Sequence, residues 1–139
     1  MTVVADSGAL YALYDADDAN HQKVKNLLET VPETIVVPVV ILSELDYLLR
    51  EFLGVGAELD FLDAISAGHF TLEPLLEDDL RRCRELIELH RDSDLGLADA
   101  AVIATAERLK VKRVLTVDER HFRAVRPNKS PFVILPADA

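Results

Sequence analysis

The stretch LADAAVIATAERLKVKRVLTVD, residues 97–118, decides the fold. Residues 97–109 are rich in Ala and carry no run of turn-forming residues, which predicts a helix. Residues 113–117 form a short apolar run, which predicts a buried strand. A helix of this length followed directly by a strand belongs to a βαβ unit, in which parallel strands form a sheet that helices cover.

The same alternation of apolar runs and helical segments extends over the rest of the chain. Pro38 suits the first position of a helix, and Gly54 ends that helix. The other predicted strands are residues 3–5, 34–37, 69–72 and 132–135, and the other predicted helices are residues 9–14, 20–29, 39–52, 55–65 and 77–90. No linker or repeat interrupts the pattern, so we expect one α/β domain over residues 1–139 with a mostly parallel central sheet.

Composition excludes several classes of protein. Half of the 139 residues are hydrophobic, which is ample for one core, and the single Cys83 excludes a disulfide framework and a zinc cluster built on cysteines. No apolar run approaches the roughly 18 residues that span a bilayer, and the first residues lack the basic segment of a secretory signal. We therefore expect a cytoplasmic protein without membrane contact.

Charge is unevenly distributed along the chain. The formal net charge is −10, which argues against a uniformly basic surface that coats duplex nucleic acid. Residues 1–100 carry 21 acidic and 7 basic side chains, whereas residues 108–129 carry 8 basic and 2 acidic ones. This asymmetry predicts two surfaces with different partners, although chance clustering on a charged helical surface would look the same.

Two acidic residues follow predicted strands. Asp6 comes directly after the first strand, and Asp118 follows the strand at residues 113–117. Ligands of open α/β sheets bind outside the carboxyl ends of the strands, so both positions suit a binding site. Thr116 projects on the same side of an extended chain as Asp118. The structural alternatives are a helix cap for Asp6 and an Asx turn for Asp118.

Two further acids lie on predicted helices among apolar residues. Glu44 has Val40, Ile41 and Leu48 at helical spacing, so we expect apolar side chains to enclose it; the alternative is a boundary position from which its carboxylate reaches water. Asp99 lies in the first turn of its helix, where the helix dipole also favours an acid. Asp94 lies five residues before Asp99, which is a rotation of about 140° on a helix, so the two cannot share a helix face. We therefore expect Asp94 to be a cap or a supporting group.

Four such carboxylates close together cannot all stay ionised without cations. Hard divalent ions with oxygen ligands, Mg²⁺ or Mn²⁺, resolve that repulsion. No histidine lies among the four positions, which argues against zinc, and we interpret His21, His69, His90 and His121 as surface or packing residues. The residues alone thus predict a metal site made of Asp6, Glu44, Asp99 and Asp118.

At this point the chain resembles a known family. Its motifs resemble those of PIN-domain ribonucleases, and especially the toxins of VapBC toxin–antitoxin pairs, over nearly the whole chain and in the same order. The motifs are Asp6-Ser7-Gly8-Ala9-Leu10, Ser43-Glu44-Leu45, DAAVIATA at residues 99–106, and Leu115-Thr116-Val117-Asp118 with Phe122. Gly8 departs from the family pattern, which often has a hydroxyl residue there. The resemblance implies a PIN-like three-layer α/β/α sandwich.

The resemblance also implies an activity and partners. It makes Asp6, Glu44, Asp99 and Asp118 the metal-binding acids of a Mg²⁺-dependent endoribonuclease, with Thr116 beside them and Ser7 a further candidate. Mn²⁺ would substitute for Mg²⁺, and a metal-activated water would hydrolyse the phosphodiester. The expected partners are an RNA substrate, a cognate antitoxin and a second copy in a homodimer. The candidate RNA-binding residues are Arg113, Arg120, Arg123 and Arg126.

Three other readings compete with a toxin. A response-regulator receiver domain also binds Mg²⁺ at strand ends, but it needs an acid pair after the first strand and a Lys after the last, which this chain lacks. A catalytically inactive binding module would not need all four acids. A PIN nuclease for RNA maturation would have the same site without an antitoxin, and the sequence does not distinguish it from a toxin.

Overall fold

The computed structural model describes residues 1–30, 34–125 and 131–139. Its strands are β1 (Thr2–Ala5), β2 (Thr34–Pro38), β3 (Thr71–Glu73), β4 (Arg113–Leu115) and β5 (Val133–Leu135). Its α-helices are α1 (Ser7–Tyr14), α2 (His21–Thr30), α3 (Leu42–Leu53), α4 (Val55–Ser66), α5 (Glu77–Leu89), α6 (Leu97–Leu109) and α7 (Glu119–Arg123), and two 3-10 turns are η1 (Val39–Ile41) and η2 (Arg91–Ser93). No helix in the described parts of the chain is long and apolar enough to cross a bilayer.

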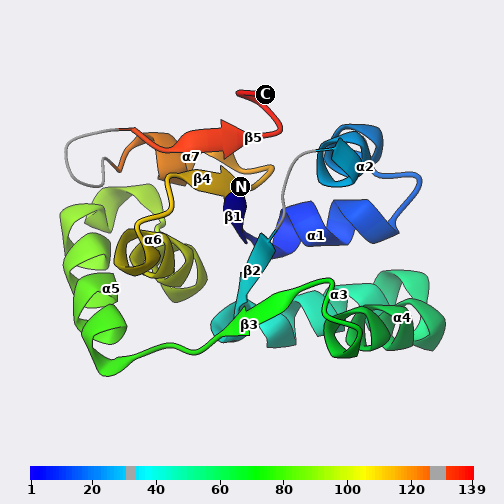
Figure 1. Cartoon of the computed structure of the whole chain (residues 1–139). Coiled ribbons are helices and arrows are strands. Elements are labelled where there is room, and N and C mark those ends of the chain that lie inside the picture. Colours follow the sequence, from blue (N-terminus) through cyan, green and yellow to red (C-terminus); the bar gives the residue numbers. More distant parts are fainter. Residues whose placement is uncertain (31–33, 126–130) are drawn as a thin grey trace.

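The strands form one parallel sheet in the order β3-β2-β1-β4-β5. Helices α5 and α6 lie on one side of the sheet, and α1 to α4 lie on the other (Figure 1). These three layers confirm the predicted α/β/α sandwich. The chain builds outward from β1 in two directions, so the topological switch point lies between β1 and β4. Ligands of open α/β sheets bind at such a point.

The core is continuous from β1 to α6. Val3, Val4 and Ala5 of β1 are fully buried, because a central parallel strand is covered on both faces. In α6 every residue from 100 to 106 is buried, and this helix packs on β1 and β2 as well as on α5. Helix α6 is therefore surrounded by protein, which is why it needs small and apolar side chains on nearly all sides.

Thr105 in the middle of α6 is expected to weaken the fold slightly. Its side chain is 1% exposed, and its hydroxyl has no hydrogen-bond partner among the described residues. Replacing Thr105 with Val removes that hydroxyl at nearly constant volume, so we expect the free energy of unfolding to rise by about 1 kcal/mol. Urea unfolding measures the change, and an unaltered or lower midpoint would show that the hydroxyl has a partner.

Several element boundaries differ from the prediction. Pro38 is the last residue of β2, paired with Glu73, rather than the first residue of a helix. Its φ of −59° suits both states, but its ψ of 129° is extended. A 3-10 turn follows, so α3 begins only at Leu42. Strand β4 ends at Leu115, two residues earlier than expected, and the short elements α7 and η2 are absent from the prediction.

Candidate active site

Asp6 joins the ends of two central strands. Its backbone N–H donates to the Leu115 carbonyl at 2.8 Å, which ties the end of β1 to the end of β4. Its carboxylate accepts the Ser7 N–H at 2.8 Å and the Thr116 hydroxyl at 3.1 Å. Asp6 thus caps α1, the structural alternative for this residue, and the same carboxylate also faces the end of β4.

The carboxyl group of Asp6 is hard to ionise. The residue is 7% exposed, and burial raises its pKa from 3.8 to about 6 against the lowering effect of the hydrogen bonds from Ser7 and Thr116. The charges on Asp99 and Glu44 raise the pKa further. Three of the four predicted acids therefore interact electrostatically, although they are up to 93 positions apart in the sequence.

Thr116 and Asp118 lie in the turn between β4 and α7. Thr116 is 1% exposed, and its hydroxyl oxygen accepts the Asp118 N–H at 3.1 Å while it donates to Asp6. Asp118 occupies the position before α7, and its side chain is 42% exposed. Gly8 at the start of α1 leaves room for this turn, because a Cβ at that position would lie 3.1 Å from Val117 Cγ2.

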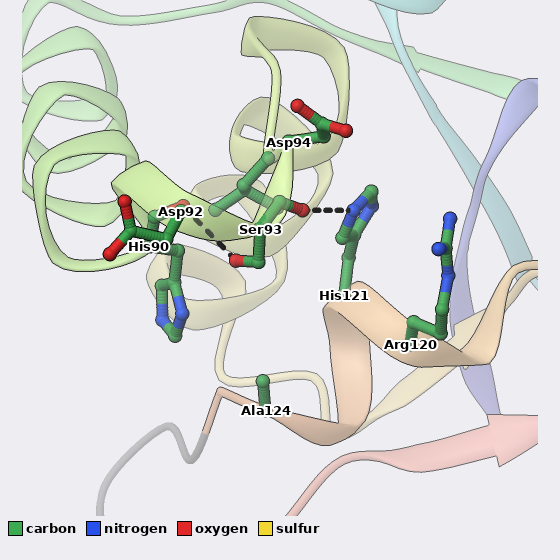
Figure 2. A pocket seen from close by; sticks show the side chains of 8 residues that line it. His90, Asp92, Ser93, Asp94, Arg120, His121 and Ala124 are labelled. Carbon is green, nitrogen blue, oxygen red and sulfur yellow. Dashed lines mark hydrogen bonds between the residues drawn. The ribbon is translucent and has the colours of Figure 1, made fainter.

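A histidine stands beside two of the predicted acids. His121 Nδ1 lies 3.0 Å from Asp99 Oδ2 and 3.7 Å from Asp118 Oδ2. Its Nε2 lies 2.9 Å from the Ser93 carbonyl oxygen (Figure 2), which only accepts, so Nε2 carries a proton. The side chain is 9% exposed, and Nδ1 has no partner in hydrogen-bond geometry among the described residues.

His121 is buried, as expected of a packing residue, but it also lies beside two of the predicted acids, which that interpretation does not include. The signal in the sequence for this position beside the acids is its spacing from Asp118. His121 follows Asp118 by three residues, so one turn of α7 brings both to the same side. Burial raises the pKa of Asp99; His121 opposes this shift, and the charge of Asp118 adds to it.

Glu44 lies differently from the expectation. It is exposed in the first turn of α3, so the prediction that apolar side chains enclose it is wrong. The reason is the late start of the helix. Val40 and Ile41 belong to the preceding 3-10 turn, so the α-helical spacing that predicts them beside Glu44 does not apply. Its charge nevertheless reaches Asp6, as the pKa of that carboxyl shows.

Asp94 is not the cap of α6, because Gly96 occupies the capping position. Asp94 instead ends the 3-10 turn η2 with a left-handed φ of 55°. It lines a cavity of about 220 Å³ that also contains Arg120 and His121 (Figure 2). This cavity lies beside Asp118, since His121 and Arg120 both contact that residue.

The donor set suits a divalent cation. Carboxylate oxygens are the ligands that Mg²⁺ and Mn²⁺ prefer, and the buried Nδ1 of His121 faces two of them without a hydrogen bond. Among the described residues, no three acidic, His or Cys side chains are arranged to hold an ion as they stand. Binding therefore requires the carboxylates to draw closer, which their mutual repulsion opposes until a cation is present.

The candidate RNA-binding arginines differ in their distance from the site and in their ion-pair partners. Arg120 has an 83% exposed side chain, with Nε 3.7 Å from Asp118 Oδ1. Arg123 is engaged by Glu119 and Asp138, each at 2.7 Å. Arg113 is the first residue of β4, so it lies at the amino ends of the strands and not at their carboxyl ends. Arg126 lies outside the described residues. Of the three described arginines, only Arg120 lies at the site.

The chain is similar in sequence to a curated ribonuclease and in fold to solved toxin structures. Ribonuclease VapC26 of Mycobacterium tuberculosis (strain ATCC 25618 / H37Rv) is 31% identical over 135 residues, which are 96% of this chain and 100% of the relative. The crystal structure of M. tuberculosis VapC20, a sarcin-ricin loop cleaving toxin, has a TM-score of 0.79 at 22% identity, over 88% of this chain and 94% of that one. A chain of a toxin-antitoxin complex from Klebsiella pneumoniae has a TM-score of 0.71 at 20% identity, over 88% and 92%. The PIN domain family model matches residues 3–127, so this chain belongs to the PIN-domain family.

Proposed function

We propose that this chain, a single PIN domain over residues 1–139, is a metal-dependent endoribonuclease and the toxin of a toxin–antitoxin pair. One observation carries the proposal. Asp6, Asp99 and Asp118 come from three distant parts of the chain and interact at the switch point of the sheet, with Thr116 between two of them. Carboxylates at this place suit the hydrolysis of phosphodiesters with bound metal ions.

Asp6, Glu44, Asp99 and Asp118 would hold the ion, Mg²⁺ in the cell with Mn²⁺ as a substitute. A bound ion lowers the pKa of a water molecule and offsets the charge that develops on the phosphate. Thr116 orients Asp6 by donating to Oδ2 and holds the backbone of Asp118. Arg120, exposed beside Asp118, is placed to attract the substrate phosphate. Because the substrate is cellular RNA, we place the protein in the cytoplasm.

The relatives support both an RNA substrate and a protein partner. VapC26 is named a ribonuclease, and the K. pneumoniae neighbour is part of a toxin-antitoxin complex. The surplus of acidic residues in positions 1–100 suits a basic antitoxin segment, and α3 and α4 expose apolar side chains that suit a protein contact. These side chains are Tyr47 and Phe52 on α3, and Val55, Leu59 and Leu62 on α4. A homodimer completes the proposed assembly.

The test is brief expression of the chain with and without the product of the adjacent gene. We expect growth arrest by the chain alone, relief by its neighbour, and new RNA ends at defined positions in sequenced RNA. In vitro, EDTA should stop cleavage and Mg²⁺ or Mn²⁺ should restore it. The Asp99→Asn variant is the control for a contaminating nuclease.

Two results would contradict parts of this proposal. Cleavage that is undiminished in EDTA would remove the metal-dependent mechanism. Cleavage without growth arrest, and with no neighbour that binds, would replace the toxin by a PIN nuclease of RNA maturation, which has the same site and no antitoxin.

A further inference from the structure

A second hollow lies on the other side of the turn that carries Asp118. It measures about 120 Å³, and its walls come from the start of α2, from the β4–α7 turn and from the chain after β5. Asn20 and Lys23 of this α2 region face Thr116, Val117 and Glu119 across it. Thr116 also hydrogen-bonds Asp6, so this hollow is one residue away from that carboxylate.

Lys23 is the cation of this hollow. Its side chain is exposed, and none of the ion pairs among the described residues involves it. The acid in the same hollow, Glu119, is already engaged by Arg123 at 2.7 Å. The ammonium group of Lys23 is therefore available to an anion that enters next to the site.

The cavity that Asp94 lines also contains a cation that is available to an anion. Arg120 lines that cavity together with His121, and its guanidinium is held only by a 3.7 Å contact to Asp118 among the described residues (Figure 2). Residues 116, 117 and 119 thus border one hollow and residues 120 and 121 border the other, with Asp118 between them in the chain and an available cation in each hollow.

We propose that single-stranded RNA crosses the turn that carries Asp118, with Lys23 binding one backbone phosphate and Arg120 another on either side of Asp118. This inference rests on the proposed function and assigns Lys23 a substrate-binding role. A net charge of −10 repels RNA, so a strand needs cations close to the carboxylates of the proposed metal site. Contacts to phosphates position a strand without selecting its sequence.

The test measures binding of a fluorescent single-stranded RNA of mixed sequence as a function of salt. Cleavage is prevented by the Asp99→Asn substitution, and wild-type protein in EDTA is the second background. We expect Lys23→Ala to weaken binding about five- to tenfold at low salt and to reduce the slope of log K against log[salt] by about 0.7. Lys25→Ala is the matched control, because Lys25 is exposed on the same helix and does not line the hollow.

A parallel pair tests the other side of the turn. Arg120→Ala should weaken RNA binding and reduce the salt slope as Lys23→Ala does. Arg113→Ala should leave both unchanged as Lys25→Ala does, because Arg113 lies at the amino end of β4, away from the site. In cleavage assays of otherwise wild-type protein, Lys23→Ala should raise KM more than it lowers kcat, because a phosphate contact is made in the ground state as well as in the transition state.

The outcomes separate this inference from the proposed function. If wild-type protein cleaves RNA but Lys23→Ala equals Lys25→Ala in affinity and in salt slope, the RNA path is overturned and the nuclease stands. If Lys23→Ala weakens only the binding of the antitoxin, the hollow is a protein contact and the path is also overturned. If wild-type protein neither binds nor cleaves RNA with Mg²⁺ or Mn²⁺, the nuclease itself fails.

Discussion

Replacing Asp6 with Asn is expected to abolish RNA cleavage and to stabilise the metal-free protein. The pKa of Asp6 is about 6 in the folded protein and near 3.8 in an unfolded chain. Between these values the folded state holds more protons, so the stability contributed by this group falls as pH rises from about 4 to about 6. Above pH 6 the ionised carboxylate costs about 3 kcal/mol. The amide side chain of the variant would carry no charge, and its oxygen would still accept the Ser7 N–H.

Thermal unfolding in EDTA, followed from pH 4 to pH 8, measures this effect. The melting temperature of Asp6→Asn should exceed that of wild type by a margin that grows up to about pH 6 and is constant above it. In Mg²⁺, cleavage should fall more than about 100-fold, because loss of a metal ligand costs at least as much as loss of a supporting group. Asp63→Asn, the same charge change on exposed α4, should alter neither property.

Two results would contradict this account of Asp6. A metal-free variant that is less stable than wild type at pH 7 would mean that the carboxylate serves mainly as the cap of α1. Full cleavage activity in the variant would remove Asp6 from the metal site.

Replacing Arg108 with Ala is expected to cost about 3 kcal/mol of stability. Arg108 on α6 lies 3.0 Å from Asp79 Oδ1 and 2.8 Å from Glu73 Oε1, and it donates to the Pro74 carbonyl at 3.2 Å. Asp79 is 3% exposed. Removing one partner of a buried ion pair leaves the other charge without compensation, which typically costs about 3–5 kcal/mol. The lower end applies, because the Leu76 N–H still donates to Asp79.

Urea unfolding measures this change against a matched control. Arg84 is exposed on α5 and takes part in no ion pair among the described residues, so Arg84→Ala should alter the free energy of unfolding by less than about 0.5 kcal/mol. Adding Asp79→Asn to Arg108→Ala should restore part of the loss, because it removes the buried charge. Equal midpoints for Arg108→Ala and Arg84→Ala would show that the ion pairs of Arg108 do not hold α5 to α6.

Local patterns are sufficient to predict most of the elements. The Ala-rich segment before β4 is predicted with the bounds that α6 has, because helix propensity is a property of the residues in the segment itself. The central strand at residues 3–5 is predicted for a similar reason, since a strand buried on both faces must be apolar throughout. Pro38 is misplaced in the prediction because its fixed φ suits a strand as well as a helix.

Contacts between distant residues are beyond such patterns. Arg123 is a candidate for RNA binding by its charge, but its guanidinium is held by Asp138 near the end of the chain. The predicted burial of Glu44 rests on helical neighbours that belong to a 3-10 turn. His121 enters the site through its contact with Asp99, 22 positions earlier. Spacing along the chain places His121 near Asp118, but it does not reveal the contact with Asp99 or the other two arrangements.

The sequence by itself determined the fold class and the placement of Asp6 and Asp118 after central strands, because alternating apolar runs fix which segments are buried and parallel strands bring their carboxyl ends to one edge. Only the tertiary structure decided that Asp6 is buried enough to resist ionisation and that His121 faces two acids. It also decided which cations remain available beside them. Burial and electrostatic interaction depend on distances in space, and the order of residues sets those distances only after the whole chain has folded.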